Sequence, residues 1–170
     1  MKEILSLEPI RKAPPLGVVL ARQGIPEGHV ISQRVRGLAE SAIALYESLA
    51  EPRGVVAEVT LGEFEEIFIG EGNNQLPAPL PEIVQEADGL ALFAATVGEA
   101  VSSRIDELFQ ENDPATACML DGIASDRAET ATTLLAQAFR HALLRQERVN
   151  NEARALPYSP GYCGWHITGQ

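Results

Sequence analysis

Residues 89–110 read GLALFAATVGEAVSSRIDELFQ, an apolar run followed by a segment with helical periodicity. The run from Gly89 to Ala95 contains no charged residue, which is typical of a strand covered on both faces. We therefore expect it to form the central strand of a sheet. Thr96 and Glu99 have the Thr-x-x-Glu spacing of a capping box, which predicts a helix that begins there and continues to Gln110.

Further helices and strands are expected on both sides of this stretch. Apolar positions recur every three or four residues from Gln33 to Ala50, after Ser32 as N-cap, and predict an amphipathic helix. Helix-forming residues dominate from Ala115 to Asn150, after the start signal Asp113-Pro114. The shorter predicted elements are an edge strand over Ile4–Pro9, a helix over Leu16–Gln23, two strands over Val55–Leu61 and Phe64–Ile69 bent at Gly62, a loop over Gly70–Pro81 and a helix over Pro81–Ala87.

This order of elements predicts an α+β fold. We expect a mixed, largely antiparallel sheet of about four strands with helices packed on it. The chain has 170 residues, of which 45% are hydrophobic and 22% charged, so it has the composition of a globular protein. A domain of this size buries about 70% of the surface that its unfolded chain exposes. We therefore expect one domain over residues 1–170, without a need for metal or disulfides.

Charge and hydropathy narrow the classes of partner. The 24 acidic and 13 basic residues give a net charge of −11, which argues against binding to nucleic acid or to an anionic membrane. No apolar run approaches the roughly 18 residues of a membrane span. Cys118 and Cys163 lack Cys-x-x-Cys spacing and are expected to be free thiols. The sequence thus predicts a cytoplasmic protein.

Common catalytic signatures are missing from the sequence. It has no Gly-x-Ser-x-Gly, no Gly-x-x-x-x-Gly-Lys and no His-Glu-x-x-His. The stretch GEGNNQ at residues 70–75 keeps only the first two glycines of a dinucleotide fingerprint and is interpreted as a turn. His29, His141 and His166 lie in three different kinds of element. We therefore assign no catalytic residue and no metal ligand.

The C-terminal segment has a different composition. Residues 154–170, RALPYSPGYCGWHITGQ, contain two of the three tyrosines and the only tryptophan. Rings held between prolines and glycines can form a rigid surface that stacks on a flat ligand. The alternative is that these rings fill a gap in the core, and composition does not decide between the two.

Ser159-Pro160-Gly161-Tyr162 resembles the Arg-x-x-x-Gly-Tyr signature of the activation domain of cobalamin-dependent methionine synthase, and more closely the short stand-alone relatives of that domain. The resemblance extends to Thr96-Val-Gly-Glu-Ala-Val and Leu120-Asp-Gly-Ile-Ala-Ser, so it covers much of residues 90–170. It implies an α+β domain that binds S-adenosylmethionine and offers the methyl group to a cobalamin held by another domain or subunit. It also implies further strands after the signature, so we expect either that this chain lacks them or that its sheet is completed differently.

The resemblance also implies which residues bind the cofactor. Gly161 would let the backbone approach S-adenosylmethionine, Tyr162 would pack near the ligand or the corrin face, and Ser159 would offer backbone contacts to the adenosyl part. The family arginine falls on Pro157, so Arg154 would have to reach back to hold the methionyl carboxylate. The full set of implied cofactor-binding residues is Arg154, Tyr158, Ser159, Pro160, Gly161 and Tyr162.

The implied partners follow from the same chemistry. A corrinoid protein or methionine synthase subunit would carry the cobalamin, and a flavodoxin or ferredoxin would supply the electron that returns oxidised cobalamin to methylcobalamin. The protein's own part would be positioning. One alternative is a non-catalytic adaptor that docks on a corrinoid protein and has lost S-adenosylmethionine binding, with Pro157 in its favour. Another is an unrelated acidic globular enzyme.

Overall fold

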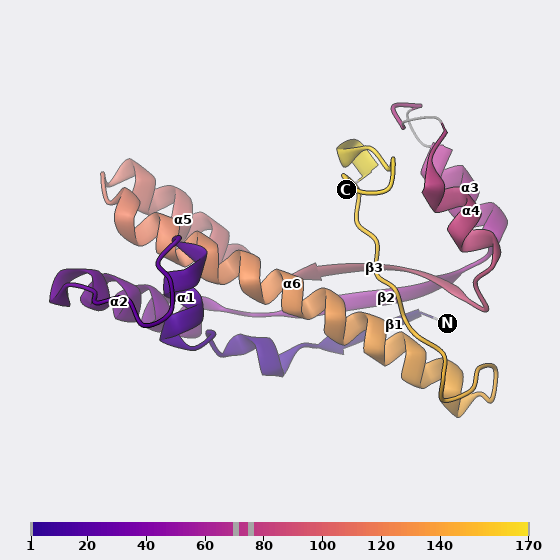
Figure 1. Ribbon diagram of the computed structural model, residues 1–170, viewed down its shortest axis with the longest axis horizontal. Coiled ribbons are helices and arrows are strands. Elements are labelled where there is room, and N and C mark those ends of the chain that lie inside the picture. Colours follow the sequence, from indigo (N-terminus) through magenta and orange to yellow (C-terminus); the bar gives the residue numbers. More distant parts are fainter. Residues whose placement is uncertain (1, 70–71, 75–76, 170) are drawn as a thin grey trace. The chain divides into compact units, whose positions relative to one another are not determined.

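The protein has an α+β fold, shown in Figure 1 as a computed structural model that describes residues 2–69, 72–74 and 77–169. Strands β1 (Lys2–Ser6), β2 (Arg53–Val59) and β3 (Leu90–Thr96) form an antiparallel sheet in the order β1-β2-β3. The helices of the described residues are α1 (Leu16–Arg22), α2 (Gln33–Leu49), α3 (Leu61–Ile69), α4 (Pro79–Gln85), α5 (Glu99–Gln110) and α6 (Pro114–Arg145), with 3-10 turns at Glu8–Arg11 and Ile167–Gly169. The predicted α+β class is thereby confirmed.

The position of β3 corrects one prediction. The apolar run was expected in the centre of the sheet, but β2 occupies the centre of this three-stranded sheet and β3 lies at its edge. Residues 90–93 are half-buried and residues 94–96 are exposed. An apolar run reports that part of a strand is covered, whereas strand order depends on pairing between distant segments that composition does not encode.

The segment predicted as a second strand of a bent pair, Phe64–Ile69, is wrong in type. It belongs to α3, which begins after a capping box: Glu63 Oε2 accepts hydrogen bonds from the Thr60 amide at 2.7 Å and the Thr60 hydroxyl at 2.8 Å. In return, Thr60 Oγ1 accepts from the Glu63 amide at 3.2 Å. These hydrogen bonds lower the pKa of Glu63, because they favour its charged form. Gly62, where a bend between two strands was expected, lies inside this helix.

The capping box expected at Thr96 and Glu99 does not form. Thr96 ends β3, and its hydroxyl accepts a hydrogen bond from the Gly98 amide at 3.0 Å. Gly98 is the N-cap of α5, with φ of +112°, and no side chain caps this helix. The predicted end of α5 at Gln110 is confirmed.

Two other helix starts follow their sequence signals. The Ser32 hydroxyl accepts from the Val35 amide at 3.3 Å and caps α2. An Asp113 carboxylate oxygen accepts from the Thr116 amide at 3.2 Å at the start of α6. However, α6 ends at Arg145 and not at Asn150, because Glu147 adopts a left-handed conformation with φ of +56°.

The chain divides into two compact units. The first unit comprises Met1–Glu3, Val55–Phe93 and Thr133–Gln170, and the second comprises Ile4–Gly54 and Ala94–Thr132. In the second unit α2 packs against both α1 and α5. Its fully buried side chains include Ile10, Val19, Ala39, Ala42, Tyr46, Val101, Leu120 and Ile123.

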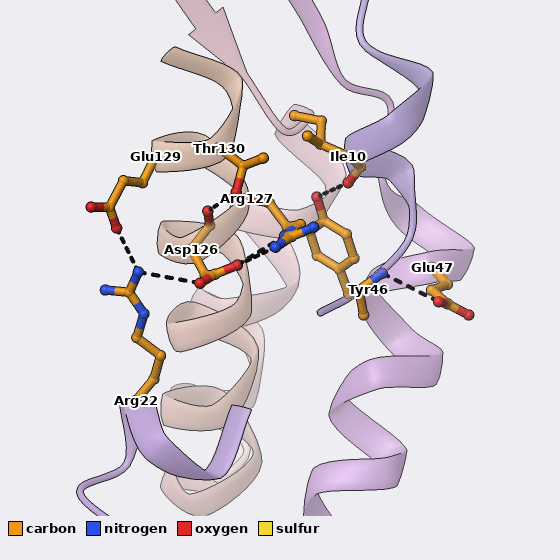
Figure 2. Close-up of polar contacts among 9 residues, drawn as sticks. Ile10, Arg22, Tyr46, Glu47, Asp126, Arg127, Glu129 and Thr130 are labelled. Atoms are coloured by element: carbon orange, nitrogen blue, oxygen red, sulfur yellow. Dashed lines mark hydrogen bonds and ion pairs between the residues drawn. The ribbon is translucent and has the colours of Figure 1, made fainter. Parts of the chain in front are cut away.

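A buried polar cluster in the second unit has a structural explanation (Figure 2). Asp126 Oδ1 accepts from Arg22 of α1 at 3.2 Å, and Asp126 Oδ2 accepts from Arg127 Nε at 2.9 Å. Arg22 also pairs with the exposed Glu129 at 2.5 Å. Both oxygens of this buried carboxylate are therefore engaged by arginine, which fastens α1 to α6 and leaves no unpartnered group for chemistry.

Tyr46 in the same unit gives a prediction about alkaline stability. Its ring is fully buried, its hydroxyl donates to the Ile10 carbonyl at 2.7 Å, and burial raises the pKa of Tyr46 from 10.0 to about 12. A raised folded pKa stabilises the native protein fully below pH 10, and this stabilisation is lost as the pH rises through about 12. The loss amounts to about 2–3 kcal/mol in total.

We expect Tyr46→Phe to cost about 1 kcal/mol at pH 7, because the Ile10 carbonyl loses its partner. Above pH 10 the variant should become less pH-sensitive than the wild type, since it has no hydroxyl to ionise on unfolding. Urea unfolding followed by circular dichroism from pH 7 to 11.5 measures both effects. Parallel pH profiles for the two proteins would contradict the assignment.

Candidate functional site

The C-terminal segment returns along α6 after that helix ends. The Arg140 guanidinium of α6 donates to two backbone carbonyls of this segment, from Nε to Ala153 at 2.6 Å and from Nη2 to Asn151 at 2.8 Å. Residues 153–159 then have no regular secondary structure. Arg140 thus fixes the start of the segment that carries the predicted site residues.

Residues 159–165 form a compact turn closed by backbone hydrogen bonds. The Tyr162 amide donates to the Ser159 carbonyl at 3.1 Å, the Trp165 amide to the Tyr162 carbonyl at 2.9 Å, and the Gly161 amide to the Trp165 carbonyl at 2.7 Å. Gly161 has φ of +97°, a conformation that glycine adopts at low cost. We call this element the C-terminal turn.

The buried side chain of Trp165 anchors the C-terminal turn in the core. Trp165 is only 8% exposed and belongs to a core cluster of the first unit. Its ring meets Phe64 edge-on at a centroid distance of 6.0 Å and lies 6.3 Å from the ring of Phe68. The other buried members of this aromatic cluster are Ala78, Leu80 and Val84. For Trp165, the interpretation as a filler of the core is therefore confirmed.

Tyr162 in the same turn is exposed to solvent. It is 69% exposed, and Ile167 beside the turn is 53% exposed. A Cβ on Gly161 would lie 3.4 Å from Ile167 Cδ1, so these two residues are neighbours. Tyr158 is half-buried against the aromatic cluster. The turn therefore divides its aromatic residues, with Trp165 in the core and Tyr162 presented to solvent.

Asn74 provides a second anchor. Its Oδ1 accepts from the His166 amide at 2.7 Å, and its Nδ2 donates to the Phe68 carbonyl near the end of α3. No local pattern in the sequence indicates this role, because residues 70–75 were interpreted as a turn and His166 is 92 residues away from Asn74. Residues 70–71 and 75–76 of that stretch lie outside the described residues.

Two hollows open on the first unit. The first, about 490 Å³, contains an ion pair of 2.5 Å between Arg148 and Glu58, and Arg148 lowers the pKa of Glu58. The second, about 770 Å³, is lined by Gln137, Arg140, Asn151, Glu152, Ala153, Arg154, Ala155 and Leu156. No residue from Tyr158 to Trp165 lines either hollow.

The predicted site residues are thus brought together only in part. Residues 159–162 share the C-terminal turn, with Tyr158 directly before it. Arg154 instead lines the second hollow, whose lining contains none of the turn residues. Pro157, which the resemblance aligns with an arginine, offers no donor. The structure therefore presents an exposed aromatic surface at the turn and a separate arginine upstream of it.

Within 2–69, 72–74 and 77–169 there is no group of three or more histidine, cysteine, aspartate or glutamate side chains that could hold a metal ion. In the same ranges, no helix combines the length and apolar character needed to cross a membrane.

The chain shows a coarse likeness to a known structure. No family model and no curated protein sequence matches it. Among solved structures, it is similar to the crystal structure of the MetH reactivation domain bound to AdoHcy, with 18% sequence identity and a TM-score of 0.48. The match covers 95% of this chain and 64% of that one, so the chain spans less than two thirds of the length of the structure that it matches. Identity and TM-score at this level describe a coarse likeness between the two chains.

Proposed function

We propose that this protein binds S-adenosylmethionine at the C-terminal turn and assists the remethylation of a cobalamin held by a partner. The observation that carries the proposal is the exposed Tyr162 on a turn that bends at Gly161 and is anchored by Trp165. Gly161 and Tyr162 lie in the Ser-Pro-Gly-Tyr segment that resembles the methionine synthase activation domain.

The chemistry would be supplied by the bound groups. The sulfonium of S-adenosylmethionine would give up its methyl group, the partner's cobalamin would receive it with one electron from a flavodoxin or ferredoxin, and S-adenosylhomocysteine would leave. The chain itself would only hold the sulfonium and the corrin in line. Tyr162 offers the face of an aromatic ring, which attracts a cation, and the net charge of −11 favours a cationic ligand.

The fit of the chain to this ligand is partial. The turn supplies an exposed aromatic face for the adenosyl and sulfonium parts, while the amides of Gly161, Tyr162 and Trp165 are already engaged in the hydrogen bonds that close it. A partner for the methionyl carboxylate is missing from the turn, because Pro157 has no donor and Arg154 lines a different hollow.

These same observations favour a second candidate function. In it, the protein is an adaptor that uses Tyr162 and Ile167 to dock on a corrinoid protein and does not bind S-adenosylmethionine. A rigid turn with exposed apolar side chains has the character of a protein-binding anchor.

Calorimetry with S-adenosylmethionine tests the proposal. We expect Tyr162→Ala to weaken binding about tenfold, because it removes the exposed ring while Trp165 keeps the turn in place. Phe109→Ala is the matched control, since Phe109 is also an exposed aromatic, at 50%, but lies on α5 in the second unit.

Three outcomes are distinguishable. Binding that is weakened by Tyr162→Ala and not by Phe109→Ala supports the ligand site. No binding of S-adenosylmethionine, together with a corrinoid protein retained by the wild type and lost by Tyr162→Ala, establishes the adaptor instead. If the wild type binds neither, both functions are wrong.

A further inference from the structure

The side chain of Asn74 connects two segments that are far apart in the sequence. One end of its amide reaches the Phe68 carbonyl in the last turn of α3, and the other accepts from the His166 amide at 2.7 Å. The last carbonyls of a helix have no partner within the helix, so the amide satisfies a group that α3 itself leaves open. Asn74 therefore acts on the end of α3 and on the C-terminal turn at once.

The hydrogen bonds of Asn74 join the same two segments as the ring contact between Phe68 and Trp165. Phe68 touches Trp165 through its ring, and its carbonyl reaches the next residue, His166, through Asn74. The ring contact is nonpolar and tolerates sliding, whereas the two hydrogen bonds are directional. The hydrogen bonds of Asn74 thus restrict how the turn can rotate over the aromatic cluster.

An uncharged amide meets both requirements at this position. The Phe68 carbonyl needs a donor and the His166 amide needs an acceptor, and a primary amide carries both. An ionised aspartate has the same shape but no donor, and it would place a negative oxygen against the Phe68 carbonyl. A protonated aspartic acid regains one donor and keeps its acceptor.

We propose that Asn74 is a positioning residue for the C-terminal turn: it holds this turn in the orientation that presents Tyr162 to the ligand. The inference rests on the proposed function for what Tyr162 binds. It extends the site to a residue in the connection between α3 and α4, which touches no ligand itself.

The single tryptophan of the chain reports on this directly, because Trp165 precedes His166. We expect Asn74→Asp at pH 7 to increase acrylamide quenching of Trp165 about twofold and to weaken S-adenosylmethionine binding about fivefold, as for the loss of one to two hydrogen bonds. Asn73→Asp is the matched control: it adds the same charge one residue earlier, at an exposed side chain. It should leave both quantities unchanged.

A pH series separates positioning from general loss of structure. Lowering the pH from 7 to about 3.5 protonates an aspartate, so the quenching of Asn74→Asp should return toward that of the wild type at the same pH. A variant that merely unfolds would not recover in acid. Asn74→Ala, which has neither donor nor charge, should show the increased quenching at both pH values.

Each result decides the inference. Quenching and affinity that change together in Asn74→Asp and not in Asn73→Asp support it. Unchanged quenching overturns the positioning role, and changed quenching with wild-type affinity overturns its link to the ligand. If the wild type binds no S-adenosylmethionine, the proposed function fails separately from the inference. Binding of a corrinoid protein then replaces the affinity measurement. If Asn74→Asp weakens the binding of neither S-adenosylmethionine nor the corrinoid protein, the inference is overturned.

Discussion

Trp165→Ala is expected to destabilise the protein by about 3–5 kcal/mol, the cost of removing a large buried ring. The ring is 8% exposed and contacts both Phe64 and Phe68, so its loss leaves a cavity that few side chains can fill. The same change removes the anchor of the C-terminal turn. Urea unfolding of the full chain, followed by far-ultraviolet circular dichroism, measures the free energy of unfolding.

Ile167→Ala is the control for this measurement. Ile167 lies two residues from Trp165 but is 53% exposed, so its truncation should cost less than about 1 kcal/mol. A cost for Trp165→Ala as small as that of Ile167→Ala would show that the ring does not support the core of the first unit.

Gly98→Ala is expected to cost about 2–4 kcal/mol, through backbone strain combined with a steric clash. Gly98 has φ of +112°, and a Cβ there would lie 2.9 Å from the backbone nitrogen of Glu51. That nitrogen donates to the Val97 carbonyl at 3.0 Å, so the clash cannot be relieved without disturbing this hydrogen bond. The affected contacts all lie in the second unit.

Gly37→Ala is expected to have the opposite effect on stability. Gly37 lies inside α2, and a Cβ there would meet no atom within 4 Å. Alanine should therefore stabilise the protein by about 0.5–1 kcal/mol through helix propensity. Thermal unfolding of both variants gives the comparison, and a neutral Gly98→Ala would mean that the entry into α5 can adopt another conformation.

Local signals predicted the helices with strong caps and long periodic faces. Ser32 and Asp113 cap their helices as their sequences indicate, because the hydrogen bonds involved join residues three apart. Such contacts need no information from elsewhere in the chain. The α+β class followed from the same elements.

The two Thr-x-Gly-Glu stretches show where local signals end. Thr60-Leu-Gly-Glu63 forms the capping box and Thr96-Val-Gly-Glu99 does not, although both have the required spacing. At the second site the backbone near Gly98 is fixed by pairing between Val97 and Glu51, which are 46 residues apart. Tertiary contacts therefore select between two sequences with equal local preference.

The candidate site was predictable to a similar extent. Sequence composition and resemblance identified residues 159–162, which share one turn. They did not identify the burial of Trp165, because its partners Phe64 and Phe68 were expected in a strand. Asn74 could not be found at all, since a single amide 92 residues from His166 leaves no periodic or motif signal.

The contact made by Arg140 has a consequence for mutational tolerance. Its guanidinium binds the carbonyls of Asn151 and Ala153, and a carbonyl is present whatever side chain a residue carries. Residues 151 and 153 can therefore vary without changing the course of the chain. Arg140 cannot vary in the same way, because a lysine ammonium lacks the planar fork that spans two acceptors. Along this segment, substitutions are tolerated at the residues whose carbonyls are bound, and they are opposed at Arg140, which binds those carbonyls.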